Sequence, residues 1–151
     1  MVAGPDLRHD ALRQVESMDY TLTWEEPWGL HVHVSGVLTP AEFFAGTRAV
    51  TQDARFVDLR YAIVNYLDVT SHTFDLRDPG ELAQANAILL GAMTGNPDIV
   101  GVVVARPEIL ELTRSMSSIA NLRWRLGYFE SELKGFDWLS AQSIVFRQRR
   151  R

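Results

Sequence analysis

The 151-residue sequence contains no cysteine, which excludes disulfides, thiolate metal sites and a cysteine nucleophile. It has no hydrophobic run near the roughly 18 residues that a membrane-spanning helix needs. Its polar first residues lack the apolar stretch of a secretory signal. Because 46% of the residues are hydrophobic, the chain can build an ordinary core, and we expect one cytoplasmic domain without a membrane span.

Positive charge is scarce outside the end of the chain. Of the 15 basic residues, four are Arg147, Arg149, Arg150 and Arg151, so 15 less 4 leaves 11 against 19 acidic residues, a net charge of −8. Nucleic acids and anionic lipids are bound by a spread of cations, which this acidic body lacks. We therefore expect no nucleic-acid partner and interpret residues 142–151 as a solvated basic tail.

Residues 1–17 form a polar leader that precedes a predicted β-hairpin. Four apolar residues of the leader have the spacing of a short amphipathic helix: Leu7, Ala11, Leu12 and Val15. Hydrophobic and polar residues alternate over 20–24 and again over 30–35, and residues 25–29 between them have turn chemistry. The pattern predicts two antiparallel strands at one side of a sheet.

Four helix starts follow the hairpin. Thr39 can cap the first amides of a helix, Pro40 needs no donor there, and Glu42 can bond back to the cap. Asp78 repeats the cap before Pro79, and further helices are predicted from Pro107 and Ser131. The side chains expected to face the core, helix by helix, are Phe43, Phe44, Thr47, Val50 and Ala54; Leu82, Ala85, Leu89, Leu90 and Met93; Ile109, Leu110, Leu112, Thr113 and Met116; and Leu133, Phe136 and Leu139.

Three further strands are predicted between these helices. Residues 61–66 show little alternation, as expected for a strand covered on both faces, and residues 99–105 are the most apolar run and should lie at the sheet centre. The last strand is expected over 122–128. The order ββαβαβαβα predicts an α/β fold with a mixed, mostly parallel five-stranded sheet and four helices.

Several stretches of this order are similar to a known family. They are the hairpin ending at Gly36, the helix start at 37–44, the run from Asp53 to Phe56 that leads into 59–65, and Phe129 followed by Trp138-Leu139. Together they resemble the SpoIIAA-like branch of the STAS superfamily, the anti-sigma-factor antagonists, over residues 18–141. The resemblance implies a STAS/SpoIIAA-like fold and a broad role in regulation or small-ligand binding.

One position departs from the regulated antagonists of that family. They carry a phosphorylated serine at the start of the helix after the third strand, where this chain reads Leu76-Arg77-Asp78-Pro79-Gly80-Glu81 without a hydroxyl. The nearest candidates, Thr70, Ser71 and Thr73, come several residues earlier. The phosphorylation switch is therefore not transferred to this chain.

A polar cluster is predicted at the carboxyl edge of the sheet, where open α/β sheets bind ligands. Asn65, Asp68 and Thr70 follow one strand and Arg106 follows its neighbour, with Tyr66 and His72 close by. These are the candidate ligand-binding residues. The alternative is an Asp68–Arg106 ion pair with Asn65 capping a turn, which needs no ligand.

No catalytic or metal motif is present. His31 and His33 point to one face of a strand and could share a metal, but two ligands do not make a site, so we expect neither metal nor cofactor. The sequence has no nucleophile elbow, phosphate loop or dinucleotide fingerprint. Most aromatic residues are expected in the core; Trp28, beside Pro27 and Gly29 in the hairpin turn, is the candidate interface residue.

Three functions follow from these observations. The leading hypothesis is a non-enzymatic regulatory domain that binds a protein partner or itself, with a homodimer formed through the hairpin or leader. The alternative is a carrier or sensor of a small apolar molecule, which predicts a cavity lined by Phe43, Phe44, Leu89 or Met93. The third is an enzyme that uses Asp68 and Arg106 at the sheet edge.

Overall fold

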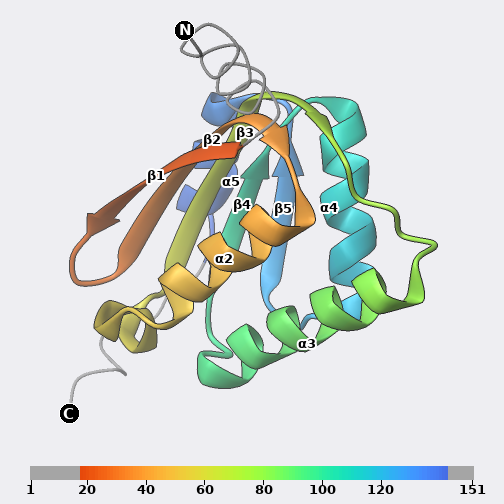
Figure 1. The fold of residues 1–151 in the computed structure, drawn as a ribbon. Helices are drawn as coiled ribbons and strands as arrows, with labels where there is room; N and C mark the ends of the chain where they lie inside the picture. Colours follow the sequence, from red (N-terminus) through yellow and green to blue (C-terminus); the bar gives the residue numbers. More distant parts are fainter. Residues whose placement is uncertain (1–17, 143–151) are drawn as a thin grey trace, which may run out of the picture.

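The computed structural model describes residues 18–142, apart from the side chain of residue 119 (Figure 1). Residues 1–17 and 143–151 lie outside this part, so the expectations for the leader helix and the basic tail stay predictions. The elements in chain order are β1 (Met18–Glu25), β2 (Gly29–Leu38), α2 (Pro40–Thr51), the 3-10 helix η1 (Ala54–Asp58), β3 (Tyr61–His72), α3 (Pro79–Gly95), β4 (Val100–Val104), α4 (Pro107–Ala120), β5 (Arg125–Phe129) and α5 (Glu132–Ser140).

The five strands form one mixed sheet in the order β1-β2-β3-β4-β5, which confirms the predicted fold. β1 pairs antiparallel with β2, and the remaining pairs are parallel. The expectation that the most apolar strand lies at the centre is wrong, because β3 holds that place and β4 lies beside it. An apolar run reports that a strand is covered on both faces, and this holds for any interior strand.

The helices cover the two faces of the sheet unequally (Figure 1). α2, α3 and α4 lie over one face, whereas α5 lies on the other and packs against β4 and β5. On β1 the residues of this second face are consequently exposed, at Asp19, Thr21 and Thr23. We call the face of β1 and β2 that α5 leaves uncovered the open face.

The predicted caps are present. The Thr39 hydroxyl accepts from the Glu42 amide at 3.3 Å and donates to Glu42 Oε1 at 2.9 Å, and the same oxygen accepts from the Met18 amide at 2.8 Å. Glu42 thereby joins the start of α2 to the start of β1. Asp78 caps α3 through its side chain, as expected, and Ser131, where the last helix was predicted to begin, caps α5.

Two expected core positions on the first two helices are wrong. α2 ends at Thr51, so Ala54 belongs to η1 and is exposed. On α3, Leu90 is 44% exposed, and Ala92 is buried instead. In a helix with apolar residues at most positions, spacing alone does not define which of two adjacent leucines faces the sheet.

The inward face of α5 also differs from the expectation. Leu133 and Phe136 are 69% and 37% exposed, and Gly135, Trp138 and Leu139 face the sheet. A Cβ on Gly135 would lie only 2.7 Å from Val102 Cγ1, so the helix approaches β4 through its glycine. This close approach turns the two flanking apolar residues outward.

A buried asparagine joins the C-terminal end of α3 to the segments that precede β3 and β5. Asn96, which is 1% exposed, donates through Nδ2 to the carbonyls of Phe56 and Leu59, both at 2.8 Å. Its own carbonyl accepts from Trp124 Nε1 at 2.7 Å. The end of α3 is thereby tied to η1 and to the segment that enters β5.

Replacing Asn96 by alanine should lower the free energy of unfolding by about 1–3 kcal/mol, because two buried hydrogen bonds are lost, while the Phe56 carbonyl keeps the Leu59 amide as a donor and the Leu59 carbonyl keeps Arg60 Nη1. Urea unfolding followed by far-UV circular dichroism measures this. The matched control is Asn121→Gly at the end of α4, where the backbone has φ 55° and favours glycine; this change should stay within about 0.5 kcal/mol. Equal losses in the two variants would contradict the role of the Asn96 amide.

Candidate functional site

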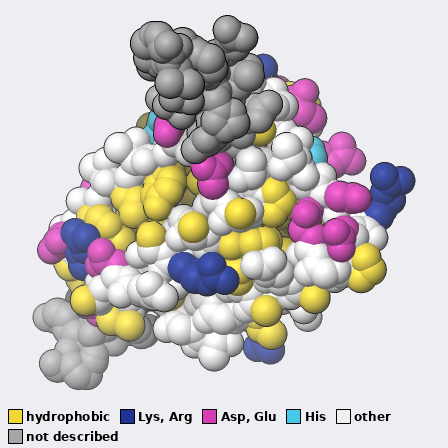
Figure 2. All heavy atoms as spheres, viewed as in Figure 1, with side chains coloured by type: hydrophobic (Ala, Val, Ile, Leu, Met, Phe, Trp, Pro, Cys, Tyr) yellow, Lys and Arg dark blue, Asp and Glu magenta, His cyan; other side chains and the backbone are white. Residues whose placement is uncertain are grey.

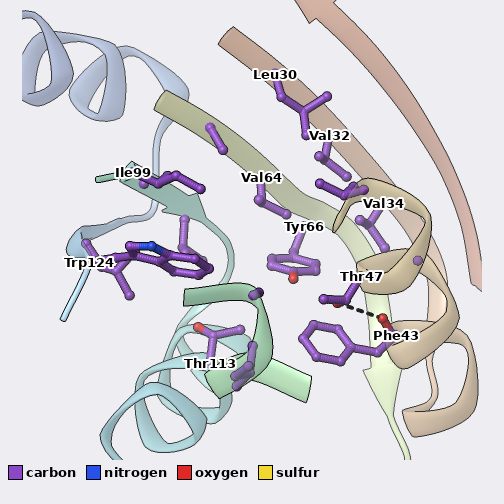
Figure 3. Close-up of a pocket in the computed structure, with 18 of the residues that line it drawn as sticks. Leu30, Val32, Val34, Phe43, Thr47, Val64, Tyr66, Ile99, Thr113 and Trp124 are labelled. Atoms are coloured by element: carbon purple, nitrogen blue, oxygen red, sulfur yellow. Dashed lines mark hydrogen bonds between the residues drawn. The ribbon is translucent and has the colours of Figure 1, made fainter. Parts of the chain in front are cut away.

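A cavity of about 220 Å³ lies between the sheet and the layer of α2, α3 and α4 (Figure 3). We call it the sheet–helix cavity. Its floor is the face of the five-stranded sheet that α2, α3 and α4 cover, and its other side is formed by these helices, by η1 and by the residues that lead into β4 and β5. The labelled side chains around it include Leu30, Val32, Val34, Val64, Phe43 and Trp124. No charged side chain is among the described residues of the lining.

Several small residues line this space. Gly46 on α2, Ala62 on β3, Ala92 on α3 and Gly101 on β4 all belong to the lining. A Cβ on Gly101 would lie 2.7 Å from Leu126 Cδ2, so the leucine already uses the room above the glycine. The sequence analysis considered only the large apolar residues of each helix. Small residues at inward positions of four elements were the signal that could have indicated the cavity.

The cavity approaches the surface between β1 and α2. Tyr20 on β1 belongs to the lining and is 40% exposed, and its ring lies 3.7 Å from where a Cβ on Gly46 would stand. Figure 2 shows hydrophobic side chains reaching the surface on this face. The Tyr20 ring therefore lies where the lining of the cavity meets the surface.

Tyr66 is the one buried tyrosine among the described lining residues. It extends from β3 into the middle of the cavity (Figure 3), is 6% exposed, and makes no hydrogen bond with the described residues. Burial raises the pKa of Tyr66 far above its ordinary value, and the nearby Tyr128 raises it further. The side chain is therefore a neutral hydroxyl at physiological pH.

The other candidate residues of β3 do not share this cavity. Successive strand residues point to opposite faces, so Asn65 lies on the face of α5, where Nδ2 donates to Glu132 Oε2 at 2.8 Å. Its Oδ1 accepts from the Leu67 amide at 2.8 Å, a local turn of the kind that the alternative interpretation described. Tyr66, the residue after Asn65, points into the cavity (Figure 3).

Asp68 is placed by a bulge in β3. His33 pairs with Asn65 but Ser35 pairs with Asp68, so β3 has one residue more than β2 over this stretch. The extra residue brings Asp68 to the face of His33, and Asp68 Oδ2 lies 2.7 Å from His33 Nε2. The expected Asp68–Arg106 ion pair is not formed, because Asp68 pairs with His33 instead.

Thr70 and Arg106 do not join the other residues of the predicted cluster either. The Thr70 hydroxyl donates to the Gly36 carbonyl at 3.2 Å, and Arg106 is the exposed N-cap residue of α4 without a side-chain cap bond. β3 continues to His72 beside β2, past the end of β4, so these residues do not surround one strand end. The enzymatic alternative, which needs Asp68 beside Arg106, has no observation in its favour.

The histidines of β2 pair with carboxylates on the open face. His31 Nε2 lies 3.2 Å from Glu25 Oε1, which also accepts a hydrogen bond from the Tyr61 hydroxyl. That hydrogen bond, opposed by burial and assisted by His31, lowers the pKa of Glu25. Within residues 18–142 no three His, Asp or Glu side chains are grouped to hold a metal ion.

Two further expectations concern single residues. Of the four side chains predicted to line a cavity, Phe43 and Leu89 do so, and Phe44 and Met93 pack in the core without joining the lining. Trp28 is half-buried in the hairpin turn, and its carbonyl accepts from the Arg60 and Tyr61 amides. Its use at an interface stays a prediction.

Comparisons with known proteins bear on the fold. No protein-family model and no curated protein sequence matches this chain. An uncharacterized protein of the DUF3478 family from Shewanella loihica PV-4, with a SpoIIAA-like fold, superposes with a TM-score of 0.50 at 11% identity, over 82% of this chain and 94% of its own. The anti-sigma factor antagonist SpoIIAA in its unphosphorylated form gives 0.47 at 13% identity, over 83% and 99%.

No helix among the described residues is both long and apolar enough to cross a membrane. The superposition on the DUF3478 protein and the order of the five strands show that the chain has the SpoIIAA-like α/β fold that the sequence resemblance implied.

Proposed function

We propose that the domain binds a small apolar molecule in the sheet–helix cavity. The observation that carries the proposal is the cavity itself, about 220 Å³ of space whose described lining contains no charged side chain. Ligand sites are typically concave and mostly apolar with a few placed polar groups, and this cavity has that composition. Apolar cavities of such size stay dry and take up apolar molecules.

The volume limits the size and affinity of the ligand. An apolar cavity of about 150 Å³ accommodates benzene, so this one has room for roughly nine non-hydrogen atoms. Burying that many carbons contributes several kcal/mol, at about 0.8 kcal/mol per methylene, of which association consumes a large part. Affinities between millimolar and micromolar follow for a ligand held by apolar contacts alone.

The start of α3 supports control by a ligand over control by phosphorylation. The Asp78 carboxylate accepts from the amides of Gly80 and Glu81 at 2.9 and 3.4 Å. These are the amides that an added phosphate would use at a helix start, and here a side chain occupies them. In the proposal, an apolar ligand takes the place of phosphorylation as the input to the domain.

Filling the cavity should abolish binding without unfolding the domain. Val64 points into the cavity from β3 (Figure 3), so Val64→Phe should weaken the binding of toluene at least tenfold. Toluene raises the unfolding midpoint of the unchanged protein because it binds only the folded state. Calorimetric titration and thermal unfolding with and without toluene measure both effects.

The control for this variant adds the same ring outside the cavity. Thr23 is exposed on the open face of β1, and Thr23→Phe should leave the toluene affinity unchanged. If Val64→Phe bound toluene as well as the unchanged protein, the cavity would not be the binding site. Native mass spectrometry of protein purified directly from cells should additionally show an added mass that Val64→Phe lacks.

A second candidate function, contact with a protein partner, is favoured by the exposed side of α5. Leu133 and Phe136 are three residues apart and 69% and 37% exposed, and the Phe136 ring lies 6.1 Å from that of His31 at the border of the open face. Exposed apolar pairs beside a polar surface are typical of interaction sites. A second copy of the chain is the partner that is simplest to test.

Self-association through this surface predicts a dimer that Leu133→Lys combined with Phe136→Lys converts to a monomer. The unfolding midpoint should change little, because both side chains are exposed. Sedimentation velocity over a range of concentrations measures the mass. Leu90→Lys, at another exposed leucine on the opposite layer, should leave the dimer intact, and a monomeric unchanged protein would contradict this candidate.

A further inference from the structure

The hydrogen-bond donors of the sheet–helix cavity differ in what they bond. On α2 the Thr47 hydroxyl donates to the Phe43 carbonyl at 2.9 Å, and the Thr51 hydroxyl donates to the Arg48 carbonyl at 3.3 Å. Figure 3 shows the first of these bonds turned along the helix. Both threonines therefore offer the cavity mainly their methyl groups.

The side-chain donors on α4 and before β5 also bond backbone carbonyls. The Thr113 hydroxyl donates to the carbonyls of Ile109 and Leu110 at 3.1 and 3.0 Å, and the Ser117 hydroxyl donates to the Thr113 carbonyl at 3.0 Å. The Trp124 indole N–H donates to the Asn96 carbonyl. These groups are satisfied before any ligand arrives.

Tyr66 is the exception among the buried lining residues. Its side chain is more than nine-tenths buried, it extends into the cavity, and its hydroxyl has no partner among the described residues. Tyr20, the other phenol of the lining, is 40% exposed and can bond water. Among the described residues the fully buried side-chain atoms without a partner are Arg60 Nε and Nη2, and the Tyr66 oxygen is not one of them, so this oxygen is accessible from within the cavity. A hydroxyl that lines a cavity and has no described partner in the protein is placed to bond a polar atom that binds there.

We infer that the ligand of this cavity is an apolar molecule with one neutral oxygen, such as a ketone, aldehyde or ester, which accepts a hydrogen bond from the Tyr66 hydroxyl. The inference rests on the proposed function and specifies its ligand. A pure hydrocarbon would leave the hydroxyl unpaired. An anion would meet no positive charge, because the described lining contains no lysine, arginine or histidine.

The protonation state of Tyr66 agrees with this assignment. Its raised pKa, caused by burial and by Tyr128, keeps the proton on the oxygen at all physiological pH values. A neutral phenol is a good donor to a carbonyl oxygen. The group therefore selects for an acceptor on the ligand and against a bound anion.

Three probes of nearly equal size and shape separate these ligand classes. Acetophenone carries a carbonyl oxygen, α-methylstyrene replaces that oxygen by a methylene group, and benzoate replaces the methyl group by a charged oxygen. All three match the volume of the cavity. The unchanged protein should bind acetophenone and α-methylstyrene and should bind benzoate at least tenfold more weakly than acetophenone.

Tyr66→Phe removes the hydroxyl and keeps the ring. The ratio of the acetophenone affinity to the α-methylstyrene affinity should fall about 3- to 15-fold, the value of one hydrogen bond. Tyr128→Phe is the matched control, because Tyr128 lies nearby but outside the lining and its ring packs under Arg114; it should leave the ratio unchanged. Titration calorimetry measures each affinity.

Thermal unfolding without ligand distinguishes recognition from a structural role. Because the Tyr66 hydroxyl has no described partner in the protein, Tyr66→Phe should keep or raise the unfolding midpoint while it lowers the preference for acetophenone. An unchanged affinity ratio in Tyr66→Phe, with both neutral probes bound, would overturn the inference and leave the proposed function standing. Failure of all three neutral and charged probes to bind would overturn both.

Discussion

The rest of the structure depends on the amide of Asn96. This buried side chain satisfies two carbonyls at the end of η1, and its backbone carbonyl receives the Trp124 indole. These bonds position Phe56, Leu59 and Trp124. The same three residues line the part of the sheet–helix cavity that adjoins η1. A polar joint in an apolar cluster is stable only when all its hydrogen bonds are made, and it then fixes its neighbours in one arrangement. These hydrogen bonds therefore fix the side of the cavity that adjoins η1.

The part of the cavity beside α2 and β1 is lined by small residues. Glu42 joins α2 to β1, and the small residues Gly46, Ala62 and Gly101 all line the cavity, with Ala62 and Gly101 paired on adjacent strands. Empty volume in a core costs about 24 cal/mol per Å³, so closely packed interiors are the rule. A domain that keeps an apolar space between two secured ends gives up stability that a ligand can restore. The same design places the unpaired Tyr66 hydroxyl where a ligand oxygen would reach it.

Elements and caps were predictable because their causes are local. Thr39, Asp78 and Ser131 each satisfy amides within three residues, and the alternation of 30–35 assigns the two faces of β2 without further information. The orientation of α5 was not predictable in this way. Gly135 approaches Val102, which is 33 positions earlier, and this contact turns Leu133 and Phe136 outward. The bulge that pairs Asp68 with His33 likewise arises from a register between two strands.

Tyr66 illustrates the division most clearly. The sequence by itself determined that Tyr66 lies on a strand covered on both faces within an α/β fold, since period and capping act between near neighbours, and it grouped Tyr66 with Asn65 in one polar cluster. Only the tertiary structure decided which layer of helices covers its face, that small residues from four elements meet there, and that its hydroxyl has no described partner. These properties depend on the packing of segments far apart in the chain, and composition and spacing along one strand carry no information about the volume left between them.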